Sequence, residues 1–371
     1  MKRAVLTFSS FLFVTTMATI GVQAKTFKSE EHDFAVEVLT DELDAPWGFA
    51  FLPDGGMLIT EKDGTLRRFD GGSLSAPLDG VPAVRSRGQG GLMDVAVDPE
   101  FAANGQVYLT YSEPGDGGVG TAVARATLGA AALEGTKVIF RQNIKTGASR
   151  HFGSRIAFAP DGTLFFAIGD RADRPRAQDP RDHAGSVLRI NKDGSVPSDN
   201  PFADGRNGLP EIWSIGHRNP QGLDIHPDTG AVWTVSHGAR GGDEINKPEA
   251  GKNYGWPVIS YGRHYFGGRI GEGTEKEGME QPRYYWDPSI APSSASFYTG
   301  DLFPKWKGDL FVGALAGQLI ARIGMDGEEI LGEERLLVGE YGRIRHVKGG
   351  PDGALYAITD DGELLRISPA D

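Results

Sequence analysis

The residues of this chain that could do chemistry include a histidine and an arginine in two short polar motifs. The motif RHFG at residues 150–153 contains His151, and imidazole has the right basicity to accept a proton near neutral pH. The motif GHRN at residues 216–219 contains Arg218, whose fixed guanidinium suits the stabilisation of negative charge. A lone histidine more often makes a local hydrogen bond, and a lone arginine can bridge backbone carbonyls, so the surrounding motifs must decide.

A pair of arginines near the C-terminus adds positive charge to an otherwise acidic protein. Arg343 and Arg345 alternate along a strand-like segment, so both guanidinium groups point to one face. Locally concentrated positive charge of this kind suits an anionic ligand. The chain has no cysteine, which excludes disulfides, thiolate metal sites and cysteine nucleophiles.

A repeated turn and strand must position these motifs. A turn rich in Pro, Asp and Gly precedes an alternating apolar strand in four places, and two degenerate copies bring the number to six. Proline fixes φ, aspartate caps the turn and glycine supplies positive φ before each strand. The turn glycines are Gly55, Gly105, Gly162, Gly230, Gly308 and Gly353.

The spacing of these turns predicts the fold. Several copies continue into a second hairpin, as in EKDGTLRRF at residues 61–69 and DDGELLRI at residues 360–367. Intervals of about 45 to 80 residues fit blades of about 40 to 50 residues with loop insertions. We therefore expect an all-β chain with one domain at residues 25–371, a six-bladed β-propeller of four-stranded antiparallel blades. A β-sandwich is the alternative, but it explains the spacing less well.

The insertions and the N-terminus give two further expectations. The longest intervals lie between Gly162 and Gly308 and hold the densest polar motifs, so we expect function in the loops there. Residues 1–24 predict a cleavable signal peptide, with a basic start, an apolar run and a small residue at Ala24. An N-terminal anchor helix is the alternative. We expect a mature chain that is periplasmic or secreted and has no membrane span.

The net charge bears on partners. A formal net charge of −12 argues against nucleic acid or anionic lipid as a partner. It leaves room for an anionic ligand in a locally basic pocket. We expect a monomer or a homodimer.

Eight ordered segments resemble one known family. They are LDAPWGFAFLPDG (43–55), GQGGLMDVAVDPEF (88–101), RHFGSRIAFAPDGTLFFAIGDR (150–171), AQDPRDHAGSVLRINKDGSVPSDNPF (177–202), EIWSIGHRNPQGL (211–223), GDEINKPEAGKNYGWP (242–257), WDPSIAPSSASFYTGDLF (286–303) and RIRHVKGGPDG (343–353). In this order they resemble the soluble aldose sugar dehydrogenases, a glucose/sorbosone dehydrogenase-type family that uses pyrroloquinoline quinone (PQQ) and calcium. The resemblance covers nearly the whole mature chain.

The resemblance implies a reaction and its catalytic residues. An aldose sugar is oxidised at its anomeric carbon to the lactone, hydride passes to PQQ, and electrons leave to an external acceptor. His151 matches the family's general base, which removes the hydroxyl proton as hydride leaves carbon. Arg218 matches the arginine against the quinone oxygen. Some branches of the family have asparagine or an acidic residue before this histidine, whereas this chain has Arg150, so the partner that orients His151 stays open.

The resemblance also implies cofactor-binding residues. Gln89 and Asn219 match neutral hydrogen-bonding positions around the substrate or the quinone, although either could cap a turn. Arg343 and Arg345 match a clamp for the carboxylates of PQQ, which number three. The family lysine expected after DLFVGAL is replaced by Ala316, and losing one cation should weaken cofactor binding by roughly 1.5 to 3 kcal/mol.

Calcium is the second implied cofactor. The carbonyl groups of Gly238 and Ala239 match ligands of the cofactor's calcium, while Glu244 and Tyr254 match a second, structural calcium site. Oxygen ligands of this kind suit a hard cation. A polar loop with surface acids is the alternative.

Two aromatic residues and two rival functions remain open at this point. Tyr285 and Trp286 suit stacking on a sugar, with packing inside a blade as the equal alternative. A calcium-dependent lactonase would need carboxylate and amide side chains converging on the channel, whereas the basic residues above fit a quinone better. A non-catalytic sugar-binding propeller is the third reading, and Ala316 is its best support.

Overall fold

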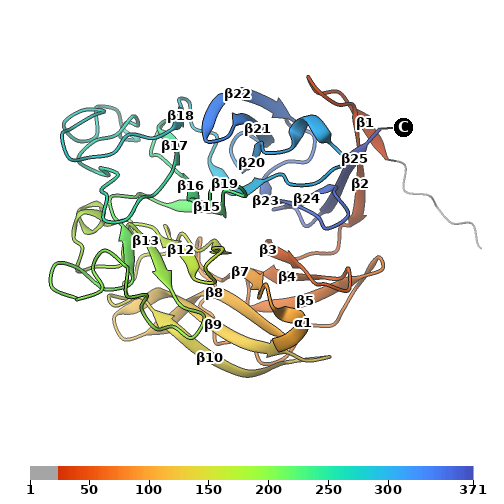
Figure 1. The fold of residues 1–371 in the computed structure, drawn as a ribbon, viewed down its shortest axis with the longest axis horizontal. Helices are drawn as coiled ribbons and strands as arrows, with labels where there is room; N and C mark the ends of the chain where they lie inside the picture. The colour runs from red at the N-terminus through yellow and green to blue at the C-terminus, as the bar shows by residue number, and fades with distance from the viewer. Residues whose placement is uncertain (1–23, 371) are drawn as a thin grey trace, which may run out of the picture.

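The computed structural model describes residues 24–370. Their strands form six antiparallel sheets (Figure 1). The first strands of the sheets, β3, β7, β11, β15, β19 and β23, each contact the first strands of both neighbouring sheets, so the sheets close into a ring. Strands β15, β19, β23, β3 and β7 gather around the centre in Figure 1. The predicted six-bladed propeller is therefore confirmed.

The first three blades follow one another along the chain. Blade 1 contains β3 (Pro46–Phe51), β4 (Met57–Glu61), β5 (Thr65–Asp70) and β6 (Ser73–Leu74). Blade 2 contains β7 (Leu92–Val97), β8 (Gln106–Gly115), β9 (Gly118–Leu128) and β10 (Leu133–Arg141), with the short helix α1 (Phe101–Asn104) between β7 and β8. Blade 3 contains β11 (Ile156–Phe158), β12 (Leu164–Ile168), β13 (Ser186–Ile190) and β14 (Ile212–Ser214), with the 3₁₀-helix η1 (Arg174–Gln178) after β12.

The other three blades complete the ring. Blade 4 contains β15 (Pro220–Ile225), β16 (Val232–Ser236), β17 (Asp243–Asn246) and β18 (Tyr284–Trp286). Blade 5 contains β19 (Pro292–Phe297), β20 (Leu310–Ala314), β21 (Leu319–Asp326) and β22 (Glu329–Leu336), with the 3₁₀-helix η2 (Pro304–Trp306) before β20. Blade 6 contains β23 (Ile344–Gly349), β24 (Leu355–Thr359), β25 (Leu364–Pro369), β2 (Phe34–Thr40) and β1 (Lys25–Phe27).

Blade 6 joins the two ends of the chain. Strand β2 pairs antiparallel with the C-terminal strand β25, from Phe34 opposite Pro369 to Thr40 opposite Leu364. Strand β1 then pairs with β2 and adds a fifth strand, one more than the sequence predicted for a blade. The ring is thus closed by backbone hydrogen bonds between segments from opposite ends of the sequence.

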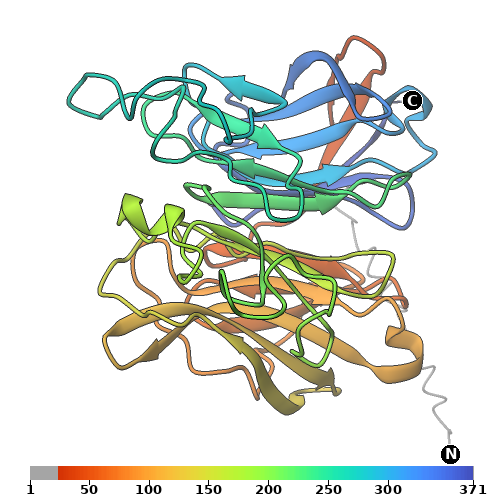
Figure 2. The ribbon, with the colours of Figure 1, turned by 60° about the vertical axis from the view of Figure 1, so that its left-hand side comes forward.

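The predicted turns all lie at one end of the central channel. All six turn glycines have positive φ, between 62° and 93°. Each turn lies between the first and second strands of a blade, and we call this end of the propeller the turn face. The opposite end, where the chain enters the first strand of each blade, is called the site face. The long loops of blades 3 and 4 project beyond the strands in Figure 2, around the green and teal segments.

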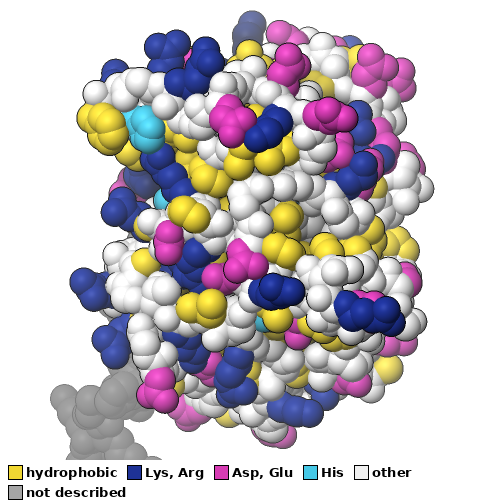
Figure 3. Space-filling model, turned by 90° about the vertical axis from the view of Figure 1, so that its left-hand side faces the viewer, with side chains coloured by type: hydrophobic (Ala, Val, Ile, Leu, Met, Phe, Trp, Pro, Cys, Tyr) yellow, Lys and Arg dark blue, Asp and Glu magenta, His cyan; other side chains and the backbone are white. Residues whose placement is uncertain are grey.

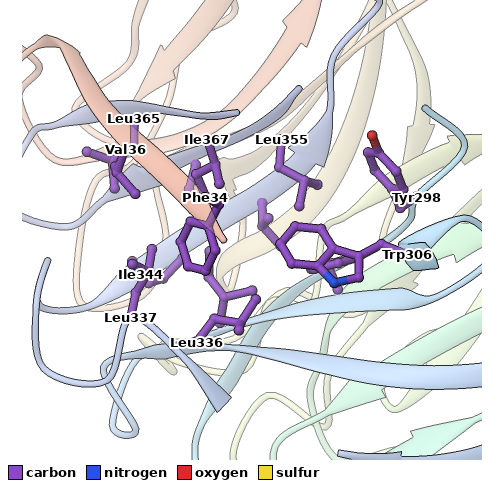
Figure 4. Packing of buried hydrophobic residues seen from close by; sticks show 14 of the residues in the cluster. Phe34, Val36, Tyr298, Trp306, Leu336, Leu337, Ile344, Leu355, Leu365 and Ile367 are labelled. Carbon is purple, nitrogen blue, oxygen red and sulfur yellow. The ribbon is translucent and has the colours of Figure 1, made fainter. Parts of the chain in front are cut away.

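The hydrophobic core is divided among the interfaces between blades. Six clusters of buried residues each join two neighbouring blades, since alternate side chains of a strand face opposite neighbours. Figure 4 shows the cluster between blades 5 and 6, where Phe34, Trp306 and Leu355 pack together. Trp286 is only 2% exposed and belongs to the cluster between blades 4 and 5, so it packs between blades rather than facing a sugar.

Two expectations concern the N-terminus and membranes. The predicted signal peptide, residues 1–24, lies outside the described residues except for Ala24. Within residues 24–370, no helix has the length and apolar character that a membrane crossing requires.

Candidate active site

The predicted catalytic and cofactor-binding residues gather on the site face. His151 precedes β11, Arg218 and Asn219 precede β15, Gln89 precedes β7, and Arg343 precedes β23. The first strands all run in the same direction through the ring, so the segments that precede them meet at one end of the channel. Residues from blades 2, 3, 4 and 6 are thereby brought to one mouth, a wider origin than the two blades that the sequence favoured.

His151 is held in a strained and buried conformation. Its φ is +58°, which an L residue adopts only when its surroundings impose it, and it is 8% exposed. Its backbone N–H donates to Oε1 of Gln89 over 2.7 Å. Its Nδ1 lies 2.6 Å from Oδ1 of Asp170. Gln89 therefore fixes the backbone of His151, and Asp170 fixes the ring.

Asp170 is the orienting partner that the sequence left open. It lies two residues after the end of β12, and its Oδ2 accepts a hydrogen bond from Nε1 of Trp256 over 2.8 Å. A carboxylate at Nδ1 favours the tautomer that carries its proton there, which leaves the lone pair on Nε2. The sequence did contain a signal for this residue, because an aspartate ends the buried strand TLFFAIGD.

The electrostatics keep this pair ready to accept a proton. Burial lowers the pKa of His151, and the hydrogen bond that Nδ1 donates to Asp170 opposes that shift without cancelling it. Burial alone would raise the pKa of Asp170, but the hydrogen bond and charge of His151, with smaller contributions from Arg218 and Trp256, lower it. At neutral pH the pair is therefore an imidazole beside a carboxylate.

Arg218 lies beside the histidine, with part of its guanidinium already bound. Its Nη1 donates to the carbonyl oxygen of His237 over 3.1 Å, and its Nη2 donates to the hydroxyl of Tyr265 over 3.4 Å. The guanidinium carbon lies 5.3 Å from the ring centre of Trp256, within cation–π range. Trp256 thus touches both Asp170 and Arg218, a connecting role that the sequence analysis did not assign.

A glycine allows the segments that carry His151 and Arg218 to approach one another. A Cβ atom built on Gly169 would lie 2.7 Å from the carbonyl oxygen of His151, 2.8 Å from Oδ1 of Asn219 and 2.9 Å from the carbonyl oxygen of Arg218. A side chain at this position would therefore separate blades 3 and 4. The close approach lets Oδ1 of Asn219 accept the N–H of Gly153 over 3.2 Å.

Two buried polar atoms at the mouth have no partner among residues 24–370. They are Nδ2 of Asn219 and Nε2 of His237. Buried polar atoms are normally hydrogen-bonded, so each one marks a place where a bound molecule can supply a partner. This observation fits a polar ligand between Asn219 and His237.

The two C-terminal arginines meet on one carboxylate. Nε of Arg343 donates to Oδ2 of Asp360 over 2.7 Å, and Nε of Arg345 donates to Oδ1 of the same residue over 2.7 Å. Arg345 also reaches Oε1 of Gln221 on blade 4 over 3.3 Å. The predicted proximity of the two guanidinium groups is present, and Asp360 neutralises only one of their two charges. Ala316 follows β20 on the same face and is exposed.

The loop with Gly238 and Ala239 is shaped by a buried aspartate. Oδ1 of Asp243 accepts the N–H of Gly238 over 2.7 Å and the hydroxyl of Ser289 over 2.9 Å. A Cβ atom on Gly238 would lie 2.2 Å from the carbonyl oxygen of Gly241 and 2.3 Å from that of Gly242. Carbonyl oxygens thus crowd around this glycine, and such oxygens are ligands that calcium accepts.

The second predicted metal site contains a carboxyl group without a cationic partner. Burial raises the pKa of Glu244 to about 7, and only a hydrogen bond from Nδ2 of Asn246, over 3.1 Å, opposes it. Oδ1 of Asn246 is buried and unpartnered among the described residues. The hydroxyl of Tyr254 donates to the carbonyl oxygen of Lys247 and accepts the N–H of Glu249 over 3.0 Å, so the backbone carbonyl of Tyr254 is the better ligand for a cation. Within residues 24–370 no cluster of three or more His, Asp or Glu side chains forms a metal site, so a cation here would require carbonyl ligands.

Two other features lie apart from these residues. Tyr285 is 45% exposed and stacks on Tyr261 with a centroid distance of 3.9 Å. A cavity of about 880 Å³ lies on the turn face, lined by residues such as Pro160, Lys192 and His226. It contains none of the predicted site residues, so the size of a cavity does not locate the chemistry of this propeller.

Comparison with known proteins shows which family the sequence resembles. The family model described as glucose/sorbosone dehydrogenase matches residues 43–366. The aldose sugar dehydrogenase YliI of Escherichia coli is 46% identical over 343 residues, which cover 90% of this chain and 92% of that protein. Quinoprotein glucose dehydrogenase B of Acinetobacter calcoaceticus is 25% identical, covering 97% of this chain and 92% of that protein.

Solved structures of aldose sugar dehydrogenases superpose on this chain. The soluble aldose sugar dehydrogenase of Escherichia coli in its apo form superposes with a TM-score of 0.88 at 45% identity, covering 91% of this chain and 100% of that one. The PQQ-bound aldose sugar dehydrogenase of Streptomyces coelicolor superposes with a TM-score of 0.76 at 28% identity, covering 90% and 98%.

Proposed function

The chain belongs to the glucose/sorbosone dehydrogenase family, and from this membership we propose that it oxidises aldose sugars at the anomeric carbon to the lactone, using PQQ and calcium. As a member of that family it is an oxidoreductase that acts on sugars. The observation that carries the finer proposal is the buried pair of His151 and Asp170 beside Arg218. A base, its orienting carboxylate and a fixed cation meet at the same mouth as the paired arginines.

The residues at the mouth fit PQQ. When bound, PQQ supplies an electrophilic quinone that takes up hydride from the sugar. Its carboxylates match the guanidinium groups of Arg343 and Arg345, whose charges Asp360 balances only in part. The unpartnered Nδ2 of Asn219 offers a hydrogen bond to an acceptor on the same ligand.

His151 is the general base of the proposed reaction. Its Nε2 removes the proton of the anomeric hydroxyl while hydride leaves the carbon. Burial lowers the pKa of His151 and keeps the ring neutral, so it is ready to accept that proton. Asp170 then stabilises the imidazolium that forms, because its carboxylate lies 2.6 Å from Nδ1.

Arg218 would supply the positive charge that favours reduction of a bound quinone. Its guanidinium is held by the carbonyl of His237 and by the face of Trp256, so little reorganisation is needed as charge develops. The Nη2 bond to Tyr265 is long, at 3.4 Å, and this donor is the one that a quinone oxygen would take over.

Calcium has two proposed places. At the first place, the carbonyl oxygens of Gly238 and Ala239 would hold a cation, which would supply Lewis acidity to a bound quinone. Farther out on blade 4, Glu244, Oδ1 of Asn246 and the carbonyl of Tyr254 would bind a structural ion. A cation at the second place would return Glu244 to its ionised form and give Asn246 its missing partner.

Reconstitution tests the proposal directly. Purified protein is mixed with PQQ and calcium, and the reduction of an artificial dye is followed with glucose, galactose and xylose, while the lactone is identified by mass spectrometry. We expect sugar-dependent dye reduction only when PQQ is present. Sugar oxidation of equal rate without PQQ, or hydrolysis of a lactone without dye reduction, would reject the proposal.

Two finer parts of the proposal concern location and electron acceptor. Residues 1–24 have the pattern of an export signal, so we propose a mature protein that begins at Lys25 and acts in the periplasm or outside the cell. Mass spectrometry of the protein from its native host tests the cleavage site. No CxxCH haem motif occurs in the sequence, so electrons would pass to a separate acceptor.

A further inference from the structure

Resting on the proposed function, we propose that Lys62 is a third cofactor-binding cation, which contacts a carboxylate of PQQ together with Arg343 and Arg345. No motif of the resemblance points to this residue. It follows β4 on blade 1, and its place is set by the register of the propeller.

The internal symmetry of the blades places Lys62 at the mouth. In blade 1, Glu61 pairs with Pro46 at the start of the first strand. The matching pair in blade 6 is Thr359 with Ile344, and the matching pair in blade 4 is Ser236 with Pro220. The next residue in each blade is therefore equivalent, and these residues are Lys62, Asp360 and His237. Two of the three already lie at the mouth, since Asp360 binds both arginines and the carbonyl of His237 binds Arg218.

The contacts of Lys62 place it beside the turn that contains Gln89 and Gly91. The carboxyl group of Glu61 accepts a hydrogen bond from Nε of Arg67 over 2.9 Å on one face of the sheet. Because side chains alternate along a strand, Lys62 lies on the opposite face. The carbonyl oxygen of Lys62 accepts the N–H of Leu92 over 3.2 Å, and its side-chain methylenes lie against Gly91. Gly91 belongs to the same turn as Gln89, which holds the backbone of His151.

The charges around Lys62 leave it free to bind an anion. Within residues 24–370 its ammonium group has no hydrogen-bonding or ion-pair partner, although the side chain is partly buried. Burial lowers the pKa of Lys62, the positive charge of Arg345 lowers it further, and Asp360 opposes both. Asp360 thus forms ion pairs with Arg343 and Arg345 only, while Lys62 adds a third positive charge nearby, and this excess of positive charge matches a ligand with several carboxylates.

Lys62 can supply the positive charge that Ala316 lacks, so that three cations lie at the mouth. Blades 1 and 5 flank blade 6, which carries Arg343 and Arg345. On blade 5 the residues after Ala314 are Leu315 and Ala316, which bring no charge to the mouth. On blade 1 the corresponding segment brings Lys62. The third cation is thus supplied from the opposite neighbour of blade 6.

Titration of PQQ by isothermal calorimetry tests this inference. Lys62→Met keeps most of the methylene stem against Gly91 and removes the charge, and Lys62→Gln serves as a second variant. The matched control is Lys348→Met, which removes a partly buried lysine at the turn-face end of the channel. We expect Lys62→Met and Lys62→Gln to raise the Kd for PQQ about tenfold to hundredfold, and Lys348→Met to leave it unchanged.

A double variant sharpens the test. Lys62→Met combined with Ala316→Lys should regain at least half of the lost binding free energy, because a cation returns to the other side of blade 6. Equal Kd values for wild type and both Lys62 variants, in protein with unchanged melting temperature, would overturn the role of Lys62 and leave the proposed function intact. No PQQ binding by any of the proteins, wild type included, would overturn the proposed function and this inference with it.

Discussion

The two faces of the propeller differ in where backbone strain is found. On the turn face, positive φ at the six repeated turns belongs to glycines, which adopt it without steric cost. On the site face lie all eight non-glycine residues with positive φ in residues 24–370. They are Ala45, His151, Ser154, Arg171, Ala172, Ala291, Gln318 and Leu337. Each such residue costs of the order of 1 to 3 kcal/mol and persists only where its surroundings impose it.

We infer from this difference that the turn face serves stability, whereas the site face carries the proposed function. The turn face repeats one solution six times, and the six hydrophobic clusters between blades support both faces alike. The site face does not repeat one turn: its non-glycine residues with positive φ lie in the segments of blades 1, 3 and 5, and its loops bring His151, Arg218 and Arg345 to one mouth. On the side of the molecule that Figure 3 shows, basic and acidic side chains are interspersed on the surface.

Removal of calcium gives the largest expected effect, because both proposed ion sites belong to the site face. Exhaustive dialysis against EDTA should abolish sugar oxidation and lower the melting temperature, since an ion bound only by the folded state adds about 2.7 kcal/mol of stability at a concentration of 100 Kd. Adding calcium to the dialysed protein should raise the melting temperature again. In Glu244→Gln this increase should be smaller, because the structural ion no longer binds. Full activity after dialysis, with calcium shown to be absent by atomic emission, would contradict both sites.

Replacement of the base comes next. His151→Ala should lower kcat by about 100-fold or more, with little change in the Kd for PQQ, because a general base acts on the barrier rather than on cofactor affinity. The matched control is His226→Ala, which removes a buried histidine of the turn face that contacts the carbonyl of Gly327. This control should lose stability and keep its kcat. Wild-type turnover in His151→Ala would remove His151 from the mechanism.

The orienting carboxylate should have a smaller effect with a pH signature. Asp170→Asn should lower kcat by about tenfold to hundredfold, because the ring loses its preferred tautomer and imidazolium stabilisation. The proposed base, His151, works in its neutral form and burial lowers its pKa, so the acid limb of kcat/KM for wild type should lie below pH 6.5. Asp170 raises that pKa, so the limb of Asp170→Asn should move to still lower pH.

The pH profile separates an orienting role from a structural one. Asp161→Asn is the control on the turn face, where Asp161 forms an ion pair with Arg189 over 2.6 Å. It should leave the acid limb where the wild type has it. A limb at or above pH 6.5 in wild type, or a limb that stays in place in Asp170→Asn, would show that His151 is not the titrating base.

The fold could be predicted from the sequence because it rests on a repeated local signal. Each turn glycine is fixed by backbone conformation alone, so Gly55 and Gly353 identify their turns without any distant residue. The fifth strand of blade 6 escaped prediction, because Lys25–Phe27 is too short to carry a pattern and joins the blade only through β2, which itself comes from the opposite end of the chain to β25.

The site was predictable only in part, because a sequence motif identifies a residue but not the residues that it contacts in the fold. His151 and Arg218 came from their motifs, whereas Asp170 and Trp256 joined them through contacts that span 19 and 86 positions. Lys62 lies in a segment that reads as an ordinary hairpin, and only the ring brings it near Arg345. The placement of Trp286 between blades also required the structure, since either face of its strand would have suited an aromatic ring.

The smallest expected effect tests the turn face itself. Gly55 has φ of +91°, and a Cβ built on it meets no atom within 4 Å, so Gly55→Ala is strained by backbone conformation alone. The cost should be about 1 to 2 kcal/mol, measured as a lower midpoint of urea unfolding, with kcat unchanged. Gly169→Ala is the contrasting variant on the site face, because its Cβ would collide with His151 and Asn219 and so should lower kcat. A loss of kcat in Gly55→Ala equal to that in Gly169→Ala would mean that the blades transmit strain from one face to the other, and the separation of stability from function would fail.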